Sequence, residues 1–109
     1  MKKIKISKTR LRELIEEAVV DCYNEEEQEG GFLVMLEENM PTPFPALVVG
    51  EEVEVIGFDL GNENRGIMAV CKRNKKKYRI SVTSLDWSGE PPAGAEWIAA
   101  YQTWLRGNW

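Results

Sequence analysis

The chain of 109 residues contains no histidine. Histidine is the commonest general base near neutral pH and a usual ligand of zinc and copper, so its absence removes the simplest routes to catalysis and to a zinc site. The sequence also lacks the phosphate-binding glycine loops, the zinc-protease helix motif and the nucleophile elbow. A pair of carboxylates could act as in glycosidases, but acid clusters usually lie on solvated faces. We therefore expect a protein that is not an enzyme.

Cysteine and long apolar runs are scarce. Cys22 and Cys71 are the only cysteines, and their spacing fits no metal-binding or redox motif. We expect two reduced thiols, with a single disulfide as the alternative. No run approaches the roughly 20 apolar residues that span a bilayer, and the basic N-terminal segment lacks the apolar stretch of a signal peptide. The sequence predicts a soluble cytoplasmic protein without a membrane partner.

Basic residues are missing from a long central stretch. Residues 13–64 hold fifteen acidic residues and no lysine or arginine, whereas residues 1–12 and 65–79 hold six and seven basic residues and no acid. The net charge of −4 therefore hides a strong segregation by sign. Seven carboxylates fall within residues 21–44 without a cation nearby in sequence. Solvent and salt, the chain's own basic segments or a bound hard cation must offset their repulsion.

Two amphipathic helices are predicted near the ends of the chain. The first spans about 8–22, and Ser7 or Thr9 can cap it because either hydroxyl can accept from a free backbone N–H. The second spans about 95–106 and ends at Gly107. Its apolar face repeats at helical spacing through Trp97, Ile98, Tyr101, Trp104 and Leu105. Core packing is the interpretation we favour for these aromatic residues, over a partner-binding groove.

A further helix is predicted between them, from about Glu25 to Asn39. Asn24 is its expected N-cap, and Glu27 three residues later completes a capping box. Gly30-Gly31 weakens the helix interior by about 1 kcal/mol per glycine but clears room for close packing. Pro41 ends the helix, because the residue before a proline is driven out of the α region.

Short strands are predicted after this helix. They cover about 46–49, 52–60 with a bulge at Gly57, 67–71 and 78–82, with 84–86 as a turn into a fifth strand or a 3₁₀ element. Such a set suits a small SH3-like β barrel at about 46–86. We expect a single α+β domain over residues 1–109. Its N-terminal helical hairpin (about 8–40) packs on the barrel and the C-terminal amphipathic helix completes it.

The acidic residues fall at the ends of the predicted helices. Asp21 closes the first helix, and Glu25, Glu26 and Glu27 open the next, so a tight corner between them would bring four carboxylates together. Ca²⁺ favours six to eight oxygen ligands, chiefly carboxylates and carbonyls. The structural alternative is equally simple, since acids at a helix N-terminus are ordinary capping chemistry and a charge run is usually a solvated face.

A second pair, Glu37 and Glu38, lies about twelve residues further along the helix. At 1.5 Å per residue the separation is roughly 18 Å, which predicts a second site rather than a shared one. The ligands that could complete it are Asn39, carbonyls of the proline-rich exit, or the sheet carboxylates Glu52, Glu54 or Asp59. No alternating Asp/Asn ladder of the EF-hand type exists in the sequence, so such sites would use helix-end and surface acids and bind weakly.

Several segments of this acidic stretch form one ungapped pattern across roughly residues 14–46. They are Asp21-Cys22-Tyr23-Asn24-Glu25-Glu26-Glu27-Gln28, Gly31-Phe32, Leu36-Glu37-Glu38-Asn39-Met40 and Pro43-Phe44. Together they resemble the bacterial calcium-binding protein family typified by the cyanobacterial protein CcbP. The resemblance implies a small cytoplasmic Ca²⁺ binder without an EF-hand, helical at its N-terminus and followed by a small β barrel.

The resemblance also indicates ligands. The acids that match the family pattern are Asp21, Glu26, Glu27, Glu37 and Glu38, while Glu25 and Glu29 are additions of this chain. The chain departs from the pattern at Cys22, Asn24, Pro41 and Pro45. We predict a low-affinity Ca²⁺ buffer or sensor with Asp21, Glu25, Glu26, Glu27, Glu37 and Glu38 as ligands. A sensor would need a two-state element, for which Gly30-Gly31 is the candidate hinge.

The basic segment Lys72–Lys77, followed by Tyr78, supports a different function. It could grip a phosphate backbone, as an SH3-like interaction or nucleic-acid-binding module would. The acidic balance of the chain and the lack of further interleaved aromatics argue against nucleic acid. The interpretation we favour is a soluble hairpin that steers electrostatically or docks on the acidic half of a partner copy.

Overall fold

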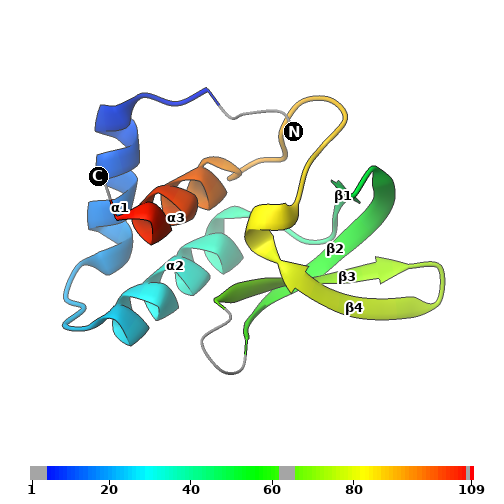
Figure 1. The fold of residues 1–109 in the computed structure, drawn as a ribbon, viewed down its shortest axis with the longest axis horizontal. Coiled ribbons are helices and arrows are strands. Elements are labelled where there is room, and N and C mark those ends of the chain that lie inside the picture. The colour runs from blue at the N-terminus through cyan, green and yellow to red at the C-terminus, as the bar shows by residue number, and fades with distance from the viewer. Residues whose placement is uncertain (1–4, 62–65, 108) are drawn as a thin grey trace.

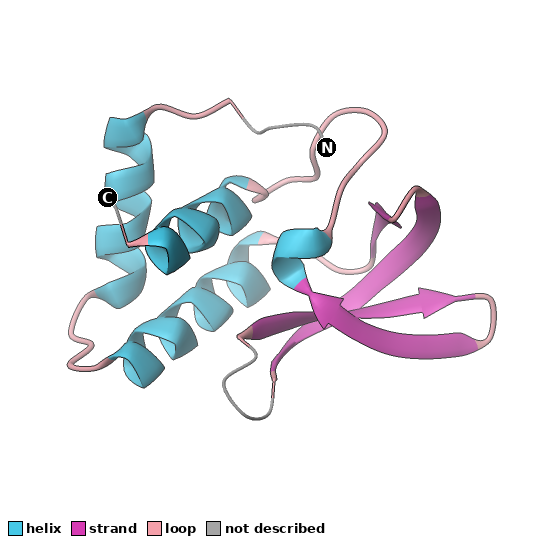
Figure 2. Ribbon diagram, in the orientation of Figure 1, coloured by secondary structure: helices cyan, strands magenta, loops and turns pink. Residues whose placement is uncertain are grey.

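The fold is α+β, as predicted (Figures 1 and 2). We describe it from a computed structural model, which covers residues 5–61, 66–107 and 109. The helices are α1 (Lys8–Val19), α2 (Glu25–Asn39) and α3 (Glu96–Arg106), with a 3₁₀ turn, η1, at Val82–Ser84. The strands are β1 (Phe44–Val48), β2 (Glu51–Leu60), β3 (Ile67–Arg73) and β4 (Lys76–Ser81). The helices gather on one side of the molecule and the sheet lies on the other (Figure 2).

Helix α1 begins at the predicted cap and ends earlier than predicted. Ser7, rather than Thr9, is the N-cap, and its hydroxyl accepts from the Arg10 N–H at 3.1 Å. The helix stops at Val19 instead of Cys22, because the chain turns there and Asp21 takes a left-handed conformation with φ 60°. Leucine, isoleucine and alanine side chains of its apolar face are buried in the core.

Helix α2 has the predicted bounds, and its N-terminus shows why. The Asn24 side chain accepts from the Glu27 N–H at 2.9 Å, while the Glu27 carboxylate accepts from the Tyr23 N–H at 3.3 Å. The reciprocal bond thus reaches one residue further back than a standard capping box, where the second donor is the cap residue itself.

The glycine pair lies inside this unbroken helix. A Cβ on Gly31 would lie 2.0 Å from the Ala18 carbonyl oxygen, whereas one on Gly30 would meet nothing within 4 Å. Gly31 therefore allows α1 and α2 to touch backbone to backbone. The two helices meet at a corner (Figure 1), and α3 contacts both, so the predicted two-helix hairpin is not confirmed.

The strands form one antiparallel sheet in the order β1-β2-β3-β4. The predicted bulge is present, since the β2–β3 register shifts between Val55 and Gly57. In place of a fifth strand there is an isolated bridge, in which Leu47 and Asp86 exchange backbone hydrogen bonds of 2.7 and 2.9 Å. The sheet of described strands is open, with β1 and β4 at its edges, so closure into an SH3-like barrel is not confirmed.

One hydrophobic cluster joins the helices to the sheet, and among the described residues no charged side chain is buried. Phe32 of α2 packs against the rings of Tyr101 and Trp104 of α3, with centroids 5.5 and 5.4 Å apart. Trp97 is 4% exposed. These contacts confirm core packing for the aromatic face of α3. Both cysteines are free thiols, and no helix within the described ranges is long and apolar enough to cross a bilayer.

Candidate metal site

The acids at the start of α2 lie where the fold itself favours them. Glu25, Glu26 and Glu27 occupy its first turn, near the positive end of the helix dipole. All three are exposed, as is Asp21 in the preceding turn. Glu27 also holds the backbone N–H of Tyr23. The helix therefore stabilises these carboxylates without requiring a bound ion.

The acids at the other end of α2 are placed differently. Glu37 and Glu38 occupy the last turn, which carries no basic residue. The helix dipole is negative there, so each carboxylate is disfavoured by about 0.3–1 kcal/mol at low ionic strength. Both side chains are exposed. A cation near this turn would relieve a repulsion that the helix does not offset.

No described lysine or arginine forms an ion pair with any of the six predicted ligands. Within the described residues, the ion pairs join Arg10 to Glu13 at 3.7 Å, Arg79 to Asp59 at 2.7 Å, and Arg73 to Glu51. None of these acids is a predicted ligand. Of the three ways to offset the central negative charge, solvent with salt and a bound cation therefore remain for the six.

The predicted ligands do not form a ready-made cage. Across residues 5–61, 66–107 and 109, no three Asp, Glu or Cys side chains lie close enough to hold a metal. Asp59, considered for the second site, is committed to Arg79. The oxygen donors suit Ca²⁺ in kind, and their side chains would have to converge when the ion binds.

Comparison with known proteins decides the family. Residues 12–105 match the model of the CcbP-type family, described as calcium binding. The chain belongs to this family. The match confirms Ca²⁺ as the ligand that the acidic pattern predicts. A solved structure, the crystal structure of Anabaena CcbP, shares the fold at 19% identity and a TM-score of 0.73, over 96% of this chain and 95% of that one. Among curated proteins, no significant match is found.

One acid of this CcbP-family chain, Glu29, has a structural role that was not predicted from the sequence. The Tyr101 hydroxyl donates to Glu29 Oε2 at 2.7 Å and accepts from the Ile67 N–H at 3.0 Å. Burial, and then the bond to Glu29, raise the pKa of Tyr101 well above its ordinary value. Next to it, Trp104 Nε1 donates to the Gln28 side chain at 2.9 Å. These bonds tie the second turn of α2 to α3 and to the start of β3.

A signal for this role exists in the sequence. Glu29 lies three and seven residues before Phe32 and Leu36, which are both fully buried, so it sits at the head of the apolar face of α2. A carboxylate in that position needs a polar partner. Its partner lies 72 residues away, which no local pattern can show.

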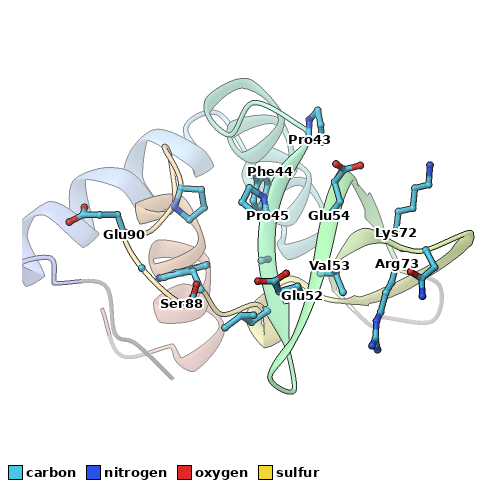
Figure 3. A pocket seen from close by; sticks show the side chains of 16 residues that line it. Pro43, Phe44, Pro45, Glu52, Val53, Glu54, Lys72, Arg73, Ser88 and Glu90 are labelled. Carbon is cyan, nitrogen blue, oxygen red and sulfur yellow. The ribbon is translucent and has the colours of Figure 1, made fainter.

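A groove of about 840 Å³ lies beside β1 and β2, and none of the six predicted ligands lines it (Figure 3). Glu52 and Glu54 of β2 line it, as do Lys72 and Arg73 from β3. The Trp87 indole N–H has no hydrogen-bond partner, but this nitrogen is itself buried beneath the surface. The groove mixes charges of both signs, with Glu90 as a third carboxylate in its lining.

Proposed function

We propose that this CcbP-family chain is a low-affinity cytoplasmic Ca²⁺-binding protein that uses surface carboxylates without an EF-hand. The proposed ligands are Asp21, Glu25, Glu26, Glu27, Glu37 and Glu38. The observation that carries the proposal is the pair Glu37 and Glu38, which the dipole of α2 disfavours and no basic side chain of that turn offsets. A hard divalent cation is the chemistry that such a pair best accommodates.

Low affinity follows from exposure. All six side chains are exposed, so they are hydrated and free to rotate before the ion arrives. Ordering a glutamate side chain costs up to about 1.5–2 kcal/mol, and several must be ordered together around one ion. Sites built from fixed, partly buried ligands avoid most of this entropy cost. The six exposed side chains proposed here would have to bear it.

The packing of α2 favours a buffer over a sensor. A sensor needs an element with two stable arrangements that the ion biases. The candidate hinge at Gly30-Gly31 lies within a continuous helix, and Gly31 is held against the Ala18 carbonyl. A bend there would break the α1–α2 contact, so we propose that the ion binds with little change in the backbone.

Calorimetric titration with Ca²⁺, and with Mg²⁺ for comparison, tests the proposal. The variant Glu37→Gln/Glu38→Gln should lose most of the binding heat, and Asp21→Asn/Glu26→Gln should reduce it further when combined. Glu16→Gln/Glu17→Gln is the matched control, because it removes two adjacent exposed carboxylates from α1. Equal losses in the control would mean that only the overall charge attracts the ion.

An NMR titration locates the site independently of heat. Backbone amides of residues 36–41 and 21–27 should shift with added Ca²⁺, and those of β4 should not. Saturable shifts confined to the sheet would contradict the ligand set while leaving Ca²⁺ binding itself intact.

A further inference from the structure

The β3–β4 hairpin concentrates six basic residues within residues 72–79, and all of them are exposed. Asn74 and Lys75 form its two-residue turn, in which Asn74 has a φ of 56°. Asparagine tolerates this left-handed conformation better than most residues do. The turn therefore holds the two strands in a fixed register and fixes which side chains face one another.

That register places like charges opposite each other. Lys72 pairs with Lys77, and Arg73 pairs with Lys76. Directly opposed like charges destabilise an antiparallel pair by an amount comparable to what opposite charges contribute, about 0.2–1 kcal/mol. A bound anion between the strands would remove this repulsion.

Acids of β2 compensate the arginines of the hairpin but not its turn lysines. Arg73 is paired with Glu51, and Arg79 with Asp59. No ion pair in the described part of the chain includes residues 75–77. Three lysines thus project from the turn and the edge strand β4 without a partner.

The acids of the α1–α2 corner are too distant to cancel them. The α1–α2 corner and the β3–β4 turn lie at opposite ends of the long axis (Figure 1), which extends 40 Å. Charges are screened over about 8 Å at physiological ionic strength. The hairpin sets six basic residues against the four acids of the neighbouring strand β2, so the charge at this end is positive although the net charge of the chain is −4.

The free energies of the possible contacts favour a nucleic-acid strand over an acidic protein surface as the partner of these lysines. Exposed ion pairs contribute about 0.2–1 kcal/mol each, so three lysines on an acidic protein surface, including a second copy of this chain, give at most about 3 kcal/mol. Association costs about 4–15 kcal/mol. A nucleic-acid strand differs, because each neutralised phosphate releases condensed counterions and even mobile lysines then yield binding.

An aromatic side chain lies beside these lysines. Tyr78 is 37% exposed and lines a shallow hollow together with Arg73, Asn74, Lys75, Lys76 and one acid, Glu51, which is the ion-pair partner of Arg73. Lys76 and Tyr78 are two positions apart on β4 and so share a face of the strand. A base that stacks on an exposed aromatic ring gains about 1–3 kcal/mol in single-stranded complexes. We propose that the β3–β4 hairpin binds single-stranded nucleic acid, with phosphates on Lys75–Lys77 and a base on Tyr78.

Fluorescence anisotropy with a labelled oligothymidine 20-mer tests this proposal on the full chain, in chelator so that Ca²⁺ plays no part. Three phosphate contacts predict that log Kobs falls with log salt at a slope of about −2. The variant Lys75→Gln/Lys76→Gln/Lys77→Gln should abolish the binding. The matched control, Lys5→Gln/Lys8→Gln/Arg12→Gln, makes the same charge change at the N-terminal end and should bind as the wild type does.

The stacking contact is tested separately. Tyr78→Ala should weaken binding about tenfold or more, whereas Tyr78→Phe should retain it. Equal affinity for a duplex of the same length, or for phosphatidylserine vesicles, would overturn the single-strand assignment. Lysines on an edge strand also deter sheet-to-sheet aggregation. If the triple-glutamine variant aggregates but binds with unchanged affinity, the lysines serve to prevent aggregation at the edge strand and the proposal fails.

Discussion

Removing negative charge from the two ends of α2 should change the stability of the protein in opposite directions. Replacing Glu37 and Glu38 with glutamine removes two charges from the negative end of the dipole, while replacing Glu25 and Glu26 removes two from the positive end. Glutamine and glutamate have similar helix propensities, so the change isolates the charge. In metal-free buffer the first variant should be more stable than the wild type and the second less stable.

The magnitude follows from the position of each charge. A carboxylate in a terminal turn contributes about 0.3–1 kcal/mol, so each double variant should shift the free energy of unfolding by about 0.6–2 kcal/mol. For a domain of this size 1 kcal/mol corresponds to about 4 °C in Tm. The difference in Tm between the two variants should therefore be about 5–16 °C at low ionic strength, and it should shrink in salt.

Calcium should act against this order for the C-terminal pair. A ligand at ten times its Kd stabilises the folded state by about 1.4 kcal/mol. The wild type should gain this amount, and Glu37→Gln/Glu38→Gln should gain much less because its ligands are gone. Thermal melts with chelator and with rising Ca²⁺ give both quantities in one experiment.

Two results would refute the reasoning. If Glu37→Gln/Glu38→Gln destabilises the metal-free protein, the two carboxylates have structural partners and the repulsion argument is wrong. If the variant keeps the full gain in Tm with Ca²⁺, the pair is not part of the site, whatever the metal-free stability shows. Glu16→Gln/Glu17→Gln removes two carboxylates from the last turn of α1, so it should also stabilise the metal-free protein, but it should keep the full gain in Tm with Ca²⁺.

The remaining predictions concern the contacts that position the helices. Gly31→Ala should destabilise the fold by about 1–3 kcal/mol or more, because its Cβ would lie 2.0 Å from a carbonyl oxygen, while Gly30→Ala should stabilise it by about 0.5–1 kcal/mol in urea unfolding. Gly94→Ala should destabilise it strongly, since this glycine has φ 84° and its Cβ would lie 2.1 Å from the Asn39 oxygen. Tyr101→Phe should cost about 1–3 kcal/mol by leaving a buried N–H unpaired. Because the folded-state pKa of Tyr101 is raised, wild-type stability should be fully present below about pH 10 and fall above it, and this fall should be smaller in Tyr101→Phe.

Local chemistry made α2 predictable. Asn24 starts the helix through a side-chain bond to a residue three positions away, and Pro41 lies just beyond its end. The end of α1 could not be predicted in the same way. The helix ends before a turn in which Asp21 has φ 60°, and α1 and α2 touch at Gly31 beyond that turn. Neither feature can be read from neighbouring residues along α1.

The sheet shows the same division. Alternation and the bulge at Gly57 predicted the strands, since each is a property of neighbouring residues. Closure into a barrel would require pairing between distant edges. The only such pairing outside the named strands, in the part of the chain described, is one bridge between Leu47 and Asp86.

The sequence shows that the candidate site is made of acidic residues. It does not show which of these acids stabilise the fold and which are available to an ion. The sequence identifies a run of acids, and nothing in the run distinguishes an acid that serves the fold from one left free for an ion. The structure separates them. Glu27 caps its own helix, and Glu29 is held by Tyr101, a residue 72 positions away.

This distinction reduces the number of acids that are good candidates for the ion site. Glu25 and Glu26 are stabilised by the dipole of α2, so their presence needs no ligand to explain it. Glu37 and Glu38 lie where the same dipole opposes them, yet they belong to the stretch that resembles the calcium-binding family. A carboxylate that destabilises the fold is best explained where it binds a ligand, because the binding free energy offsets the loss of stability. The least favourable carboxylates on α2 are for this reason the best candidates for its ion, and the favourable ones are best regarded as secondary ligands.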